Sequence, residues 1–215
     1  MKNNKVKKGK HDYLDQIDAY YSGQLSSHEV IEMGITPNIL QEYGASELPL
    51  VMQQSTLTKC VRKATGSRSA HELTRDTIEK LPDQIHNPIF LIRDRNRNSI
   101  ALISDVKDKN NNNILIAIRL NEKRKTVQVN EIKSVYGKTR LKEYLLKNLE
   151  AKQLHIINKN KAENLSRVLG LQLPTTLIDF SCKNSIPLYY EAVKNDCNVK
   201  KSCEKESTKW TERSC

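Results

Sequence analysis

Histidine is the residue type in this chain best suited to proton transfer, because its side chain changes charge near neutral pH. The 215 residues include five: His11, His28, His71, His86 and His155. We select His71 as the candidate general base, since its segment Ser-Ala-His-Glu-Leu is expected to start a helix and follows the cationic Gly-Ser-Arg of residues 66–68. The competing interpretation is that His71 is an ordinary first-turn residue beside the helix-start carboxylate of Glu72.

A second group of candidates lies where the sequence changes from strand-like to helix-like, in the Ser-Val-Tyr-Gly of residues 134–137. Ser134 could bind a phosphate oxygen, and Tyr136 could donate a hydrogen bond to phosphate, stack on a base or act as an acid. Side chains alternate along a strand, so Ser134 and Tyr136 are expected to share one face. The other face is then expected to carry Glu131, Lys133 and Val135. The alternative for Tyr136 is a corner residue whose ring covers the sheet.

Polar and cationic residues continue beyond this stretch. Lys138, Thr139 and Arg140 stand at the start of the next predicted helix, where free backbone N–H groups favour an anion. Cations are slightly unfavourable for the helix itself at this position, which favours a binding role. Three further candidates stand at strand ends and are expected to reach the same edge of the sheet: Arg119, Asn158 and Lys159. Each of them alone is also typical of a solvated surface.

The charge balance indicates an anionic partner. The net charge is +11, from 36 Lys and Arg against 25 Asp and Glu, and nucleic acid is the commonest partner of so basic a chain. Charged flanking runs can also be merely solvated. With only two Phe and one Trp, the sequence predicts no clear platform for stacking bases.

Several other classes of site and location are disfavoured. The chain contains no His-Glu-x-x-His, paired-Asp or Cys-cluster pattern, so neither a metal site nor a cofactor is predicted. Five cysteines without a Cys-x-x-Cys pair favour free thiols in a reducing compartment. No run approaches the roughly 18 apolar residues of a membrane span, and the N-terminus lacks the apolar core of a signal peptide. We therefore expect no membrane partner and a cytoplasmic location.

The elements expected in the first third of the chain are mainly helical. Residues 1–12 are basic and expected to be disordered, and 13–33 are expected to form a helical extension of two short pieces. A helix over 36–44 and extended chain over 47–57 follow. Two helices separated by a basic loop are expected within 55–80.

After Pro82 the sequence changes to short runs rich in β-branched residues and separated by Asn-rich turns, which predicts four strands in meander order. A helix over 140–152, a short strand over 154–160, a helix over 161–170 and a further strand over 176–181 are expected next. The cysteine-bearing tail 184–215 is expected to be poorly ordered. This order predicts an α+β fold, with N-terminal helices packed on a four- to five-stranded antiparallel meander sheet and further helices after it on one side.

Five short motifs carry a resemblance to a known family. They are LPLVM at 48–52, NP at 87–88, SVYG at 134–137, INK at 157–159 and LGLQLP at 169–174. Their order and rough spacing resemble those of the phage MuF C-terminal domain family, over a domain that we place at 34–183. That family is similar to the barnase, EndoU, colicin and RelE group of small nucleases. The resemblance implies helices on a four- or five-stranded sheet and a histidine at about the place of His71.

Two functional hypotheses follow. The first is a nuclease or toxin domain encoded by a phage or mobile element, which cleaves RNA rather than DNA without a metal. In it His71, Tyr136 and Ser134 perform the chemistry, and the partners include a cognate immunity protein or a host target. The alternative is a non-catalytic phage protein of the same fold that binds and inhibits a host defence or nucleic-acid-processing complex. Fold analogy alone does not decide between them.

Overall fold

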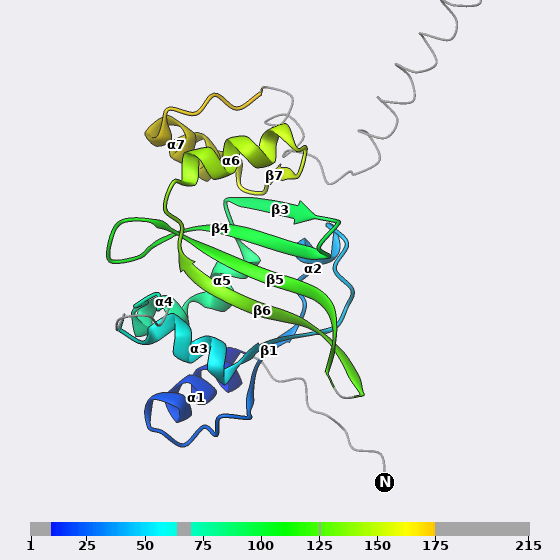
Figure 1. The fold of residues 1–215 in the computed structure, drawn as a ribbon, viewed down its shortest axis with the longest axis vertical. Helices are drawn as coiled ribbons and strands as arrows, with labels where there is room; N and C mark the ends of the chain where they lie inside the picture. Colours follow the sequence, from blue (N-terminus) through cyan, green and yellow to red (C-terminus); the bar gives the residue numbers. More distant parts are fainter. Residues whose placement is uncertain (1–9, 64–69, 125, 175–215) are drawn as a thin grey trace, which may run out of the picture.

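The computed structural model describes residues 10–63, 70–124 and 126–174, which form a mixed α+β fold (Figure 1). Its helices are α1 (Lys10–Tyr21), α2 (Asn38–Gln41), α3 (Gln54–Val61), α4 (Arg75–Glu79), α5 (Leu81–His86), α6 (Leu141–Glu150) and α7 (Lys159–Leu169). Its strands are β1 (Val30–Ile35), β2 (Pro49–Gln53), β3 (Phe90–Asp94), β4 (Ser99–Lys107), β5 (Asn113–Arg124), β6 (Val127–Gly137) and β7 (Leu154–Ile156).

The predicted meander is confirmed. Strands β3, β4, β5 and β6 pair with their chain neighbours in antiparallel register. The Asn-rich clusters between them form the turns, and Asn98 and Asn111 take positive φ angles of 47° and 63°, which Asn tolerates better than most residues. The helices α6 and α7 and the short strand β7 also lie where the sequence predicts them. The predicted strand 176–181 and the tail 184–215 lie outside the described residues.

The sheet is larger than the predicted four- or five-stranded meander. It has seven strands in the order β1-β2-β6-β5-β4-β3-β7, and β2 lies parallel to β6, with Met52 opposite Ile132. The prediction of an all-antiparallel sheet is therefore wrong. The pairing of β2 with β6, which are far apart in the chain, is decided by tertiary packing, and no local pattern in either segment predicts it.

The N-terminal part also differs from expectation. The helix α1 begins at Lys10, inside the stretch 1–12 expected to be disordered, and the second helical piece expected within 13–33 is replaced by strand β1. β1 is an edge strand that pairs with β2, and its Ile31 is fully buried. The amide of Gln16 in α1 bonds the N–H and C=O of Glu32, so a side chain occupies part of the open strand edge.

Helices cover both faces of the sheet, and the two helices that follow the meander, α6 and α7, lie on one side of it, as predicted. The back face, which bears Ile116 and Val135, packs against residues of α1, α3, α4 and α5 in one hydrophobic cluster. The front face, which bears Leu115 and Tyr136, packs against α6 and α7 in a second cluster. Figure 1 shows α6 and α7 together at one end of the view and α1 and α3 at the other. Ala117, also on the front face, is only partly buried.

Candidate functional site

The site is built around the corner between β6 and α6. Strand β6 ends at Gly137, and the next N–H, of Lys138, donates to the carbonyl of Asn113 at 2.8 Å. Arg140 then takes a left-handed conformation (φ 50°) as the N-cap residue of α6. A β-carbon at Gly137 would fall on the carboxylate of Asp108. Glycine is therefore required here because Asp108, in the loop between β4 and β5, approaches closely, and not because of a positive φ.

A bulge at Lys133 changes the predicted assignment of side chains to faces. Ala117 pairs with Ser134 but its neighbour Ile118 pairs with Ile132, so Lys133 is the extra residue. Ile132 and Val135 both enter the back cluster. The prediction that Glu131, Lys133 and Val135 share a face is wrong, because a two-residue period does not hold across a bulge.

Glu131 is buried in a cluster of charges. It alternates with Ile132 and therefore points to the front, where it is 1% exposed. Arg124 holds its carboxylate through two contacts at 2.7 and 3.0 Å, Lys133 lies 3.0 Å away, and Gln53 donates at 2.7 Å. The bulge and this cluster together leave Ser134 and Tyr136 on the front face, which confirms that these two share a face.

His71 lies beside both of these residues. The prediction that His71 starts a helix is wrong: it lies in an irregular segment before α4, which Thr74 caps, and the neighbouring Glu72 has a positive φ of 50°. Its N–H donates to the carbonyl of Lys59, which fixes the segment against the end of α3. Its Nε2 is 3.4 Å from Ser134 Oγ, and its ring centroid is 5.2 Å from that of Tyr136. The three candidate catalytic residues are thus brought together; the loop 66–68 lies outside the described residues.

The surroundings set the protonation states of this group. Burial, followed by the charges of Lys59 and Arg62, lowers the pKa of His71 below its usual value, so its imidazole is neutral at pH 7. Burial raises the pKa of Tyr136, so its hydroxyl stays protonated. His71 is therefore suited to accept a proton, and Tyr136 to donate a hydrogen bond and not a proton.

Tyr144 extends this group of rings and was not among the predicted site residues. The ammonium of Lys138 lies 4.6 Å from the centroid of its ring. Burial, followed by the neighbouring Tyr136 and Asp94, raises the pKa of Tyr144 to about 12. The sequence allowed Tyr136 and Tyr144 to contribute to base stacking, but its low aromatic content predicted no clear platform.

Arg119 lies on the front face of the sheet but not at the predicted edge. It follows Leu115 and Ala117 along the front of β5 and is exposed, opposite Glu131 and Ser99 in the neighbouring strands. Leu115 is the partner of Tyr136, so Arg119 stands four residues, or about 13 Å, farther along the sheet. Arg119 can therefore meet an extended ligand and not the same phosphate.

Asn158 and Lys159 lie elsewhere. Strand β7 pairs with β3 at the opposite edge of the sheet from β1, and Asn158 caps α7 by accepting from the N–H of Lys161 at 3.1 Å while its amide donates to Asn87. Lys159 is the first residue of α7. The ends of β7 and β6 lie at the same end of the strands, as predicted, because Ile156, Phe90, Ile103, Leu115 and Tyr136 are successive partners across the sheet. Three strands, β3, β4 and β5, nevertheless separate Asn158 and Lys159 from β6, so these two residues do not belong to the His71 group. Thr139 and Arg140 remain exposed at the corner.

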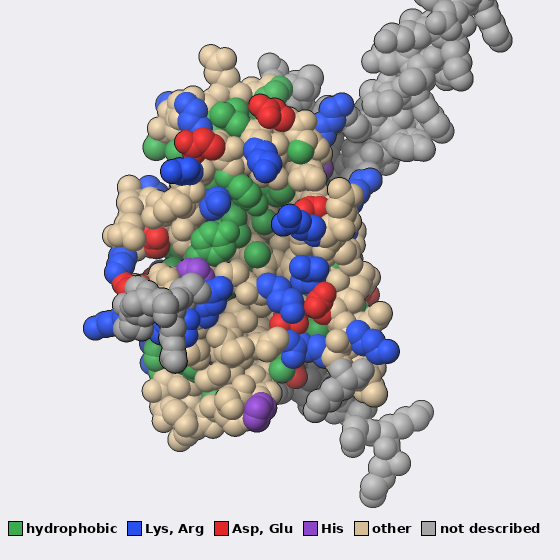
Figure 2. All heavy atoms as spheres, viewed as in Figure 1, with side chains coloured by type: hydrophobic (Ala, Val, Ile, Leu, Met, Phe, Trp, Pro, Cys, Tyr) green, Lys and Arg blue, Asp and Glu red, His purple; other side chains and the backbone are tan. Residues whose placement is uncertain are grey.

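The molecular surface around His71, Ser134 and Tyr136 is partly apolar. Figure 2 shows a hydrophobic patch bordered by a histidine, with Lys and Arg side chains around it and several Asp and Glu side chains among them. The partly buried apolar residues of the front cluster include Ala101, Ala117, Tyr136 and Tyr144. The site is therefore an open, partly apolar surface and not a closed cavity.

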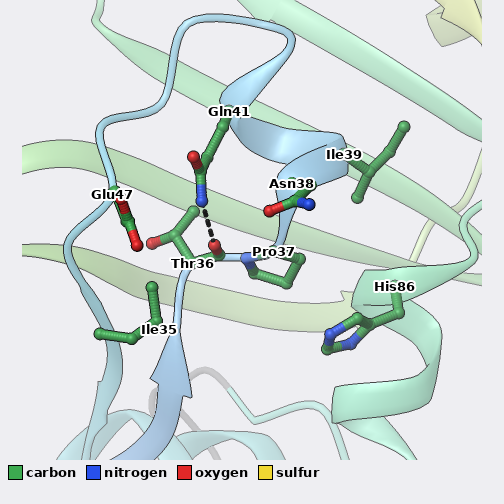
Figure 3. A pocket seen from close by; sticks show the side chains of 8 residues that line it. All are labelled: Ile35, Thr36, Pro37, Asn38, Ile39, Gln41, Glu47 and His86. Atoms are coloured by element: carbon green, nitrogen blue, oxygen red, sulfur yellow. Dashed lines mark hydrogen bonds between the residues drawn. The ribbon is translucent and has the colours of Figure 1, made fainter.

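A separate depression of about 390 Å³ lies where β1 and α2 meet α5 (Figure 3). Gln41 in its wall donates to the carbonyl of Thr36 at 2.7 Å, and His86 Nδ1 lies 2.7 Å from the carbonyl of Pro82. These two polar side chains thus serve the local backbone, and none of the predicted site residues lines the depression.

Comparison with known families agrees with the predicted resemblance. Residues 62–164 match the model of the phage MuF C-terminal domain. The matched segment, slightly less than half of the chain, runs from the end of α3 into α7 and contains His71, Ser134, Tyr136 and Arg119. No curated protein and no solved structure matches the chain. Likeness to the barnase-type nuclease fold therefore stays a prediction.

Within the described ranges, no set of three or more His, Cys, Asp and Glu side chains could hold a metal ion. Of the helices that the structure describes, none has the length and apolar character needed to cross a membrane.

Proposed function

We propose that this protein is a phage-encoded RNA-cleaving domain in which His71 is the general base. The observation that carries the proposal is a half-buried histidine, neutral at pH 7, that contacts Ser134 and Tyr136 on an open sheet face. A neutral imidazole within reach of a ligand is the group that a general base requires. The match to a phage domain family supports the phage context.

The reaction that suits these groups is cleavage by the RNA's own 2′-hydroxyl. His71 Nε2 takes the proton of that hydroxyl, the 2′-oxygen bonds to phosphorus, and the bond from phosphorus to the 5′-oxygen breaks. The products are a 2′,3′-cyclic phosphate and a 5′-hydroxyl, whose proton comes from water. The hydroxyls of Ser134 and Tyr136 donate to the phosphate oxygens, where negative charge develops.

A cleaving toxin would need a cognate immunity protein in the cell that makes it, and it would act in a cytoplasm. The same front face also supports the second candidate, a non-catalytic protein that binds a host defence or nucleic-acid-processing complex and inhibits it. The partly exposed apolar residues of this face favour this candidate, because an exposed apolar patch is typical of a surface that binds another protein.

The test is cleavage of a 5′-labelled RNA by the purified protein, with and without EDTA. We expect products ending in a cyclic phosphate, and a loss of rate of about 10²- to 10⁴-fold in His71→Ala. His28→Ala is the matched control, because His28 is exposed in the turn before β1. Equal rates in His71→Ala and His28→Ala would show that His71 is not the base.

If the wild-type protein leaves RNA intact under both conditions, cleavage is rejected. Purification from the host together with one nucleic-acid-processing complex, whose activity falls on binding, would then support the inhibitor.

A further inference from the structure

Three rings, those of His71, Tyr136 and Tyr144, and the ammonium group of Lys138 lie together at the corner of the front face, and we call this group the ring row. The ring of His71 lies 5.2 Å from that of Tyr136, Tyr136 and Tyr144 pack against the same hydrophobic cluster, and the ammonium of Lys138 lies 4.6 Å from the centroid of the Tyr144 ring. All four side chains are partly exposed. The row comes from three segments: the chain before α4, the end of β6 and the first turns of α6.

The cations of the front face continue from this row along the sheet. Arg119 lies about 13 Å beyond the Leu115–Tyr136 pair. Lys133 and Arg124 follow on the same side through their pairs with Glu131. Among the described residues, no ion pair engages Arg119. A chain with phosphates several ångströms apart could contact both the ring row and Arg119.

We propose that the ring row binds an unpaired nucleobase, and that the strand carrying it runs over the front face to Arg119, so that the ligand is single-stranded RNA. The inference rests on the proposed function, because it assigns a ligand class to the same site. Aromatic rings beside cations are the features by which proteins hold single strands, since every base offers a face for stacking.

The partial burial of the rings decides between single strand and duplex. Tyr136 and Tyr144 pack against the cluster under α6, so only part of each ring is open to a ligand. A paired base inside an A-form helix cannot reach such a ring, whereas a base of a single strand can turn out and stack. Stacking on these rings therefore selects a single strand over a duplex.

The experiment measures binding separately from cleavage. The probe is a labelled 2′-O-methyl RNA of about 12 nucleotides, which lacks the attacking hydroxyl, and the competitor is the same sequence as a duplex. We expect Tyr144→Leu to weaken single-strand binding by a factor between about 5 and about 150, as for the loss of one stacked base. Tyr21→Leu is the matched control, because Tyr21 also lies under a cation, Arg75, but on α1.

The salt dependence tests the path of the strand. Replacing Arg119 by Ala should reduce the slope of log affinity against log salt by about 0.7, the value for one phosphate contact on a single strand. Arg167→Ala, an exposed arginine in the last turn of α7, should leave the slope unchanged.

The results separate this inference from the proposed cleavage. Single-strand binding that depends on Tyr144 supports the inference even if unmodified RNA stays intact, in which case only the cleavage fails. Equal binding of duplex and single strand, or equal affinity of Tyr144→Leu and Tyr21→Leu, overturns the inference even if RNA is cleaved.

Discussion

Replacement of Gly137 by alanine should destabilise the protein through one contact, that with Asp108. The added β-carbon would fall on the Asp108 carboxylate, and the β-carbon of Asp108 would be only 3.0 Å away. The aspartate cannot easily move aside, because its carboxylate accepts from Asn110 N at 2.9 Å, Asn112 N at 2.8 Å and Asn112 Nδ2 at 3.1 Å.

The magnitude follows from these bonds. Each contributes about 0.5–1.5 kcal/mol in a partly exposed loop, so displacing the carboxylate costs about 2–3 kcal/mol. Alanine in place of glycine also stabilises the protein by about 0.5 kcal/mol, because it lowers the conformational entropy of the unfolded chain and the φ of Gly137 is not positive. The net loss should be about 2 kcal/mol, which lowers the melting temperature by about 6 °C for a chain of this size.

The assay is urea denaturation of the wild type, Gly137→Ala, Asp108→Ala and the double variant. In the Asp108→Ala background the clash with the carboxylate is gone and only the β-carbon of residue 108 remains, at 3.0 Å, so we expect Gly137→Ala to be close to neutral. The coupling between the two sites should therefore be about 2 kcal/mol. An equal cost of Gly137→Ala in both backgrounds would refute the close-approach explanation and point to some other requirement of the corner.

Three further outcomes are expected. The kcat/KM for RNA cleavage should rise with pH to a plateau, with a midpoint below pH 6.5, because burial lowers the pKa of His71 and only the neutral imidazole accepts a proton; a midpoint above 6.5 would exclude His71. Glu131→Gln should lower the free energy of unfolding by about 2 kcal/mol in urea titrations, since Arg124 and Lys133 lose their shared counter-charge; both are partly exposed, so the loss is smaller than for a fully buried pair. Burial raises the pKa of Cys60 to about 11, so in mass spectrometry after alkylation at about pH 8 its peptide should be labelled only once the protein is unfolded.

The sequence alone determined the elements whose signals are local. Turn-forming asparagines and β-branched runs fixed the four meander strands. The change of period at Gly137 located the corner, and Gly170, with a positive φ of 59°, ended α7 as predicted. The pairing of Ser134 with Tyr136 on one face was also predictable, because both lie on the same side of the bulge.

Only the tertiary structure decided which strands pair and which distant residues come into contact. The parallel pairing of β2 with β6, the contact of His71 with Ser134 across 63 residues, and the position of Asn158 at the far edge all depend on strand order. Strand order is set by which apolar surfaces pack best over the whole chain. The hydrophobic periods of two residues for a strand and 3.6 for a helix indicate the type of an element but not its neighbours. The bulge at Lys133 is local, yet it too followed from pairing, because an extra residue exists only relative to the partner strand.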